Sequence, residues 1–139
     1  MDLFNVGFTG TQEGMTEEQK ATLYTLLSNL EQFDEFHHGD CVGSDAQAHE
    51  IAMELCMRRV IHPPIDPKKR AFCKGDVILP EKEYIERNHD IVDTTQWLIA
   101  TPKEHHRVRR SGTWATVRYA ESQRKDVAII WPDGSVSGV

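Results

Sequence analysis

The chain has 139 residues, of which 39% are hydrophobic and 27% charged, with a formal net charge of −6. This length and composition predict a single domain over residues 1–139 with a hydrophobic core, and they exclude a disordered segment. The negative charge argues against a protein that mainly holds nucleic acid, where a basic face is expected. The net charge does not exclude a small anionic ligand that is bound by a local cluster of residues.

Membrane and secretion signals are not predicted. The longest apolar run, Val127–Trp131, is far too short to cross a bilayer. The start of the chain carries Asp2 and lacks a basic segment followed by an apolar one, so no secretory signal is expected. The chain has three cysteines, an odd number, and they show no CxxC spacing: Cys41, Cys56 and Cys73. We therefore expect no disulfide framework and a cytoplasmic protein.

The first half of the chain alternates between strand and helix patterns. An apolar run over 3–8 predicts a buried strand that ends in a glycine loop. Thr16 and Gln19 have the spacing of a capping box, and the helix that follows has leucines at helical intervals, at Leu23, Leu26, Leu27 and Leu30. A short strand is expected over 35–38, a helix begins at a second capping-box pattern, Ser44 with Gln47, and a strand ends at Val60–Ile61.

The second half continues the alternation after a long loop. Residues 63–80 contain four prolines, Pro63, Pro64, Pro67 and Pro80, and predict a loop. A helix is expected over 81–93, with Ile85 and Val92 inward if it is simply amphipathic, and then a strand over 96–100. The loop 101–110 leads to a helix that starts near Thr113 and to a strand over 126–131, and the tail 135–139 is expected to fray. Alternating strands and helices predict an α/β fold, a Rossmann-like three-layer sandwich around a mostly parallel five-stranded sheet.

Three loops fall where such folds bind ligands, at the carboxyl ends of strands. Each combines glycine with small hydroxyl residues, which lets backbone amides and a helix N-terminus approach a phosphate. The same residues also occur in ordinary strand-to-helix turns, so both interpretations stand. The ligand-binding candidates in these loops are Thr9, Gly10, Thr11, Gly39, Gly43, Ser44, Ser111, Gly112 and Thr113.

Several charged and polar residues adjoin these loops. The segment Lys103–Arg110 is basic on an acidic chain, so Arg110 is a candidate phosphate ligand, although a charge run is also what a solvated loop carries. In the helix over 81–93, Tyr84 could stack on a base while Arg87 and Asn88 reach a ligand. The alternative for these three residues is a solvated face of an amphipathic helix.

Asp40 and Asp45 flank the second glycine loop and are the candidate catalytic residues. A carboxylate there can bind a ribose, or serve as an acid, a base or the stabiliser of a cationic transition state in N-glycosidic cleavage. Helix capping is the alternative for both. No metal site is predicted, because His37, His38, Cys41 and His49 match no standard zinc spacing.

Six segments together resemble the SLOG superfamily of Rossmann-like proteins, nearest to its small YpsA-related members, some of them labelled molybdenum-cofactor carriers. The segments are Gly7–Gly10, His38–Ala46, Ile61–Pro64, Arg87-Asn88, Ile91–Asp93 and Arg110–Trp114. The resemblance covers nearly the whole chain. It implies a nucleotide-like ligand, such as ADP-ribose or a nucleoside phosphate, over the glycine loops. It also implies a homodimer or larger assembly, as relatives commonly form.

One departure bears on activity. LOG-type phosphoribohydrolases of this superfamily carry a catalytic glutamate after the phosphate loop, and Thr116 occupies the matching position here. The first hypothesis is therefore a sensor, carrier or sequestering protein that binds a nucleotide-derived ligand. The second is a hydrolase of the N-glycosidic bond in which Asp40 or Asp45 replaces the glutamate. The third is a carrier of molybdopterin, whose phosphate suits the same loops. DNA binding of the kind found in DprA-type relatives is disfavoured by the net charge.

Overall fold

The computed structural model describes residues 4–30 and 35–138, and these form alternating strands and helices. Asp2, Leu3 and Val139 lie outside the described residues. In chain order the elements are β1 (Val6–Gly10), α1 (Glu17–Ser28), β2 (Glu35–His38), α2 (Ser44–Glu54), β3 (Arg58–Ile61), β4 (Val77–Ile78), α3 (Tyr84–Asp93), β5 (Trp97–Thr101), α4 (Gly112–Ser122), β6 (Asp126–Ile130) and β7 (Val136–Gly138).

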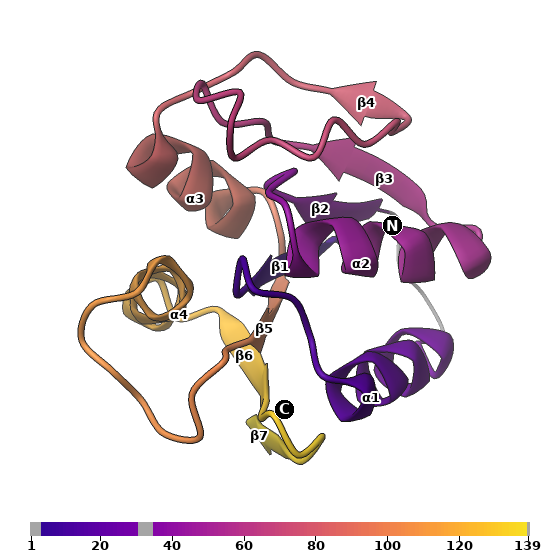
Figure 1. Cartoon of the computed structure of the whole chain (residues 1–139), viewed down its shortest axis with the longest axis vertical. Helices are drawn as coiled ribbons and strands as arrows, with labels where there is room; N and C mark the ends of the chain where they lie inside the picture. The colour runs from indigo at the N-terminus through magenta and orange to yellow at the C-terminus, as the bar shows by residue number, and fades with distance from the viewer. Residues whose placement is uncertain (1–3, 31–34, 139) are drawn as a thin grey trace.

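The strands form one sheet in the order β4-β3-β2-β1-β5-β6-β7. Neighbouring strands are parallel except β7, which pairs antiparallel with β6. Helices α1 and α2 cover one face of the sheet and α3 and α4 the other, as Figure 1 shows. The predicted α/β three-layer sandwich is thus confirmed.

The prediction of five strands was wrong, because the sheet has seven. Strand β4 has only two residues and lies inside the proline-rich segment, where local sequence gave no strand pattern. Strand β7 lies in the tail that we expected to fray. A turn over 132–135 brings that tail back along β6, where Trp131 N–H bonds to the Ser135 carbonyl at 2.8 Å. Both strands depend on a neighbour that supplies the hydrogen bonds.

The core has one apolar cluster on each face of the sheet. Below α1 and α2 lie Phe8, Phe36 and the inward leucines Leu23 and Leu27, all fully buried. On the opposite face, Trp114 of α4 packs with residues of α3 and β5. The helical spacing therefore identified the buried face of α1 correctly. On α3 the expectation was wrong for Ile85, which is 69% exposed, because Ile91 and Val92 supply the buried contacts.

Helix α1 begins as its capping box predicts. The Thr16 hydroxyl accepts the Gln19 N–H, and the Gln19 side chain accepts the Thr16 N–H, both at 3.0 Å. The second predicted capping box, at Ser44 and Gln47, was wrong. Gly43 is the N-cap of α2, and the Ser44 hydroxyl donates to the Thr11 carbonyl at 2.6 Å instead. The Ser44 hydroxyl, which the local pattern assigned to a helix cap, thus forms a tertiary hydrogen bond with the loop after β1.

The topology brings the ends of β1, β2 and β5 to one edge of the sheet, because these strands are parallel neighbours. The loops that follow them are those that the sequence marked with glycine. Within the ranges 4–30 and 35–138, the helices are all too short or too polar to cross a membrane.

Candidate functional site

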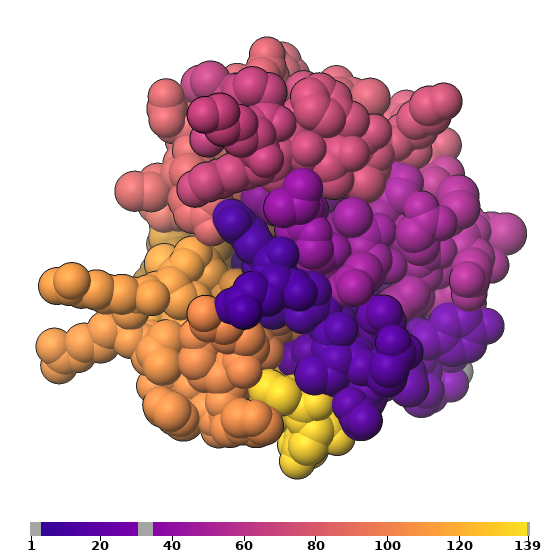
Figure 2. Space-filling view, viewed as in Figure 1, coloured from indigo at the N-terminus to yellow at the C-terminus, as the bar shows by residue number. Residues whose placement is uncertain are grey.

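A pocket of about 370 Å³ opens at this edge of the sheet, between the loop after β1 and the N-terminus of α4. In Figure 2 the loop after β1 (indigo) lies against the segment that joins β5 to α4 (orange). The pocket is lined by Gly10, Thr11, Gln12, Glu13, Tyr84, Lys103, Glu104, Arg110, Ser111, Gly112 and Thr113. Six of these, Gly10, Thr11, Arg110, Ser111, Gly112 and Thr113, are ligand-binding candidates from the sequence.

The loop after β1 is held from both sides. The Thr11 N–H bonds to the Thr101 carbonyl at the end of β5, at 3.1 Å. The Thr11 carbonyl accepts both the backbone N–H of Ser44, at 3.1 Å, and its hydroxyl. Gly43 has φ of +90°, and a Cβ there would overlap the Gln12 backbone. Glycine is therefore required at position 43 because the first two loops touch there.

The start of α4 forms the opposite wall. Ser111 is the N-cap, and its hydroxyl accepts the Trp114 N–H at 3.2 Å. The N–H groups of the first turn have no partner within the helix and carry the positive end of its dipole. Gly112 lies against the Tyr84 hydroxyl, which leaves no space for a side chain at position 112. This wall has the properties of an anion site.

The charged residues of the pocket have mixed signs. Lys103 Nζ pairs with Glu13 Oε2 at 2.7 Å, and Glu104 Oε1 accepts the indole N–H of Trp114 at 3.0 Å. Arg110 lines the pocket, whereas Arg107 turns away and forms two hydrogen bonds to Glu121, at 3.0 and 2.7 Å. The basic segment therefore divides between the pocket and the outer face of α4.

Sequence reasoning missed three lining residues, Gln12, Glu13 and Glu104. Their positions in the chain, directly after β1 and β5, were the only signal available. Thr9 lies within β1, half-buried, opposite Ala100 of β5. Thr116, at the position of the LOG glutamate, is buried and donates its hydroxyl to the Gly112 carbonyl at 2.8 Å.

Arg87 organises a buried layer behind the pocket. Its side chain is 3% exposed and donates to the carbonyls of Gly39 and His62 and, at 2.8 Å, to Asn88 Oδ1. Its guanidinium carbon lies 5.0 Å from the centre of the Tyr84 ring. The buried guanidinium of Arg87 therefore stabilises the loop after β2 through its hydrogen bond to the Gly39 carbonyl.

Asp45 belongs to the same buried layer. Its carboxylate accepts the Cys41 N–H at 3.1 Å and lies close to Gly39. Burial raises the pKa of Asp45 to about 6, although the nearby Arg87 guanidinium acts in the opposite direction. A carboxyl group with this pKa can both donate and accept a proton near neutral pH. Asp45 is not among the residues that line the pocket.

Asp40 has a different environment. It is fully buried, has φ of +55°, and accepts hydrogen bonds from Arg70 Nε at 3.0 Å and the Cys73 N–H at 2.9 Å. Both carboxylate oxygens are thus engaged by the segment between β3 and β4. This geometry points to an anchor for that segment.

The histidines form two buried pairs. His37 Nδ1 lies 2.8 Å from His62 Nε2, and His38 Nε2 lies 2.9 Å from His49 Nδ1. Cys73 adjoins the second pair, so three side chains from three segments could hold a metal ion. Burial raises the pKa of the Cys73 thiol to about 12, which makes it a poor nucleophile while no cation is near.

Comparison of the sequence with protein-family models gave no match, and comparison with curated proteins gave none. Solved structures do match. The chain aligns over 94% of its length with 78% of the molybdenum cofactor binding protein from the phototrophic bacterium Rippkaea orientalis, at 20% identity and a TM-score of 0.72. It also aligns over 91% of its length with DNA processing protein A from Helicobacter pylori, at 16% identity and a TM-score of 0.62.

The chain shares the fold of these two proteins. At these identities the likeness shows the fold alone. The chain spans 64% of the length of the H. pylori protein, whose structure describes single-stranded DNA binding.

Proposed function

We propose that this protein binds a phosphate-bearing small molecule, a nucleotide or a pterin cofactor, in the pocket between the loop after β1 and α4. The observation that carries the proposal is the convergence of Arg110 and the α4 N-terminus on one pocket in a chain of net charge −6. The pocket volume of about 370 Å³ falls within the range of small-molecule sites, roughly 300–1,000 Å³.

The two walls of the pocket suit the two parts of such a ligand. The phosphate would lie at Ser111–Thr113, where helix N–H groups and Arg110 provide charge-assisted hydrogen bonds. Tyr84 would provide an aromatic surface for a base or a pterin ring. The similarity to a molybdenum cofactor binding protein supports a pterin as one candidate, and the phosphate contacts would be the same for either ligand.

Binding without turnover is the role that we favour. Thr116 replaces the glutamate expected of a LOG-type hydrolase, and Asp40 is engaged by Arg70 and the Cys73 N–H. Hydrolysis of an N-glycosidic bond is the second candidate, supported by the pKa of about 6 at Asp45. Single-stranded DNA is disfavoured by the net charge, despite the resemblance to a DNA processing protein.

Arg110→Gln and Arg109→Gln form a matched pair for the test. Both residues are exposed and neighbours in sequence, and each substitution changes the net charge equally, but only Arg110 lines the pocket. Calorimetry with AMP, ADP-ribose, a phosphorylated pterin and adenosine should show phosphate-dependent binding that weakens at least tenfold, about 1.4 kcal/mol, in Arg110→Gln only. Equal losses in both variants, or equal affinity for adenosine and AMP, would contradict the proposal.

The same mixtures separate a binder from a hydrolase. Chromatography after incubation should recover the intact nucleotide. Release of free base that stops in Asp45→Asn would instead establish the hydrolase. A homodimer or larger homo-oligomer and a cytoplasmic location are also part of the proposal. The free thiols of Cys41, Cys56 and Cys73 suit a reducing compartment.

A further inference from the structure

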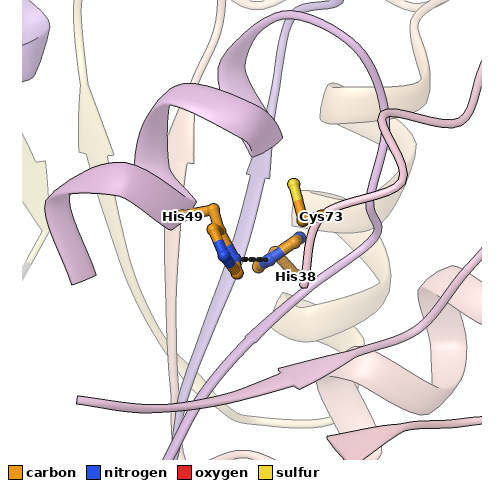
Figure 3. A group of neighbouring side chains, drawn as sticks. All are labelled: His38, His49 and Cys73. Carbon is orange, nitrogen blue, oxygen red and sulfur yellow. Dashed lines mark hydrogen bonds between the residues drawn. The ribbon is translucent and has the colours of Figure 1, made fainter. Parts of the chain in front are cut away.

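A second group of chemically active side chains lies on the far side of the loop after β2. His38 is the last residue of β2, His49 lies on α2, and Cys73 lies in the segment between β3 and β4. Figure 3 shows the two imidazole rings in contact and the cysteine beside them. One nitrogen of each histidine and the cysteine sulfur all lie within 4.8 Å of one another. We propose that His38, His49 and Cys73 bind a zinc-like divalent metal ion.

The donor set is the reason for choosing this class of ion. Two imidazole nitrogens and a thiolate form a borderline-soft set that suits Zn²⁺ and Co²⁺ and does not suit Mg²⁺ or Ca²⁺. Tetrahedral Zn²⁺ with Zn–N distances of about 2.0–2.1 Å places two nitrogen ligands roughly 3.3 Å apart. His38 Nε2 and His49 Nδ1 are 2.9 Å apart, so the rings need to separate by only a few tenths of an ångström.

The site is accessible from solvent. A cavity of about 410 Å³ lies between α2 and the segment 71–74, and both His49 and Cys73 line it. An ion can enter by this route, and water can complete its coordination. Three protein ligands with a fourth position open to solvent is the arrangement of catalytic rather than structural zinc sites.

The surrounding residues hold two ligands in place. A hydrogen bond with the backbone of Lys74 helps to orient the His49 ring. Asp40 fixes the position of Cys73 by accepting its backbone N–H at 2.9 Å. Arg59, which pairs with Asp76, places its Nη1 3.3 Å from His49 Nε2, the ring nitrogen that does not face His38.

His38 is the ligand that must adjust. Its Nδ1 accepts the Asp40 N–H at 3.0 Å, so the ring hydrogen is on Nε2 in the free protein. A metal on Nε2 moves this hydrogen to Nδ1, and Nδ1 can then no longer accept from the Asp40 amide. The Asp40 peptide follows Gly39 and has φ of +55°. We therefore expect metal binding to displace the backbone of residues 39–41.

Cobalt is the probe for the test, since tetrahedral Co²⁺ absorbs in the visible and a cobalt–thiolate bond adds a near-ultraviolet charge-transfer band. Titration of the metal-free protein with CoCl₂ should show both signals, saturate at one ion per chain and reverse on addition of ZnCl₂. Cys73→Ser should lose the near-ultraviolet band. Cys56→Ser, at an exposed thiol outside the group, should keep it.

His49→Gln provides a second variant and should bind Zn²⁺ at least tenfold more weakly. Circular dichroism checks that each variant is folded. Amide NMR signals of residues 39–41 should shift on Zn²⁺ loading, and in His49→Gln the same shift should require at least tenfold more Zn²⁺. Absence of the thiolate band in the wild-type protein, or its persistence in Cys73→Ser, would overturn the proposal without reference to any phosphate ligand.

Discussion

The guanidinium carbon of Arg87 lies 5.0 Å from the centre of the Tyr84 ring, and the hydroxyl of the same tyrosine contacts Gly112. Tyr84 therefore joins the buried layer around Arg87 to the wall of the pocket at the start of α4. Because Arg87 also donates to the Gly39 carbonyl, the loops after β2 and β5 are connected through two side chains of α3.

Gly112→Ala should destabilise the protein by about 1–3 kcal/mol, because a Cβ at position 112 would overlap the Tyr84 hydroxyl. Tyr84→Phe removes that hydroxyl, so the double variant should lose less stability than the two single losses added together. Urea unfolding of the four proteins measures this coupling. Simple additivity would show that Tyr84 and Gly112 do not meet.

Gly43→Ala should cost more than Gly14→Ala although both glycines have positive φ, +90° and +96°. A Cβ at position 43 would overlap the Gln12 backbone, whereas one at position 14 meets only the end of the Gln47 side chain. We expect a loss of about 1 kcal/mol at Gly14, from backbone strain alone, and of at least about 3 kcal/mol at Gly43. Thermal unfolding of both variants checks the order, and similar losses would mean that the first two loops are not in contact.

Arg87→Met should reduce the free energy of unfolding by about 3–5 kcal/mol, because it leaves the buried Asp45 without its cation and two carbonyls without a donor. In the same variant the pKa of Asp45 should rise above 6, since the Arg87 guanidinium now lowers it. Urea unfolding and carboxyl ¹³C NMR measure the two effects. Lys20→Gln, which removes an exposed i,i+3 ion pair with Glu17, should change stability by less than about 1 kcal/mol.

Stability should fall as the pH drops below 6.5. Burial lowers the pKa of His62 to about 3, and burial also lowers the pKa of His38 and of His37. Between pH 6.5 and these lower values the unfolded chain binds protons that the folded chain does not, so acid favours unfolding. Asp45, with its pKa raised to about 6, binds a proton in the folded state and partly opposes this trend below pH 6.

The variant His62→Gln measures how much His62 alone contributes to the pH dependence of stability. Its loss of stability from pH 7.5 to 5.5 should be smaller than that of the wild type by about 1.4 kcal/mol, the contribution of one histidine that stays neutral when folded. An unchanged slope in His62→Gln would show that His62 is not held neutral.

Regular elements of this protein were readable from local sequence because amphipathic spacing records which side of a segment is buried. The leucines of α1, the Thr16–Gln19 cap and the residues of β2 needed no knowledge of distant partners. The glycine and hydroxyl content marked the loops after β1, β2 and β5 as candidates for ligand binding, and residues after β1 and β5 line the pocket. Strands β4 and β7 could not be predicted this way, since each has only two or three residues and is defined by its pairing with β3 or β6.

The sequence by itself determined an α/β layered fold with glycine loops at the ends of its strands, whereas the tertiary structure decided what each polar side chain does. Asp40 pairs with Arg70 thirty residues away, Ser44 turns from its own helix to Thr11, and the sequence offers no spacing that joins His38 and His49 to Cys73. The physical reason is that a buried polar group must find a partner wherever the chain provides one. The partner of each buried polar group depends on contacts between distant segments, and these contacts produce no periodic pattern in the sequence.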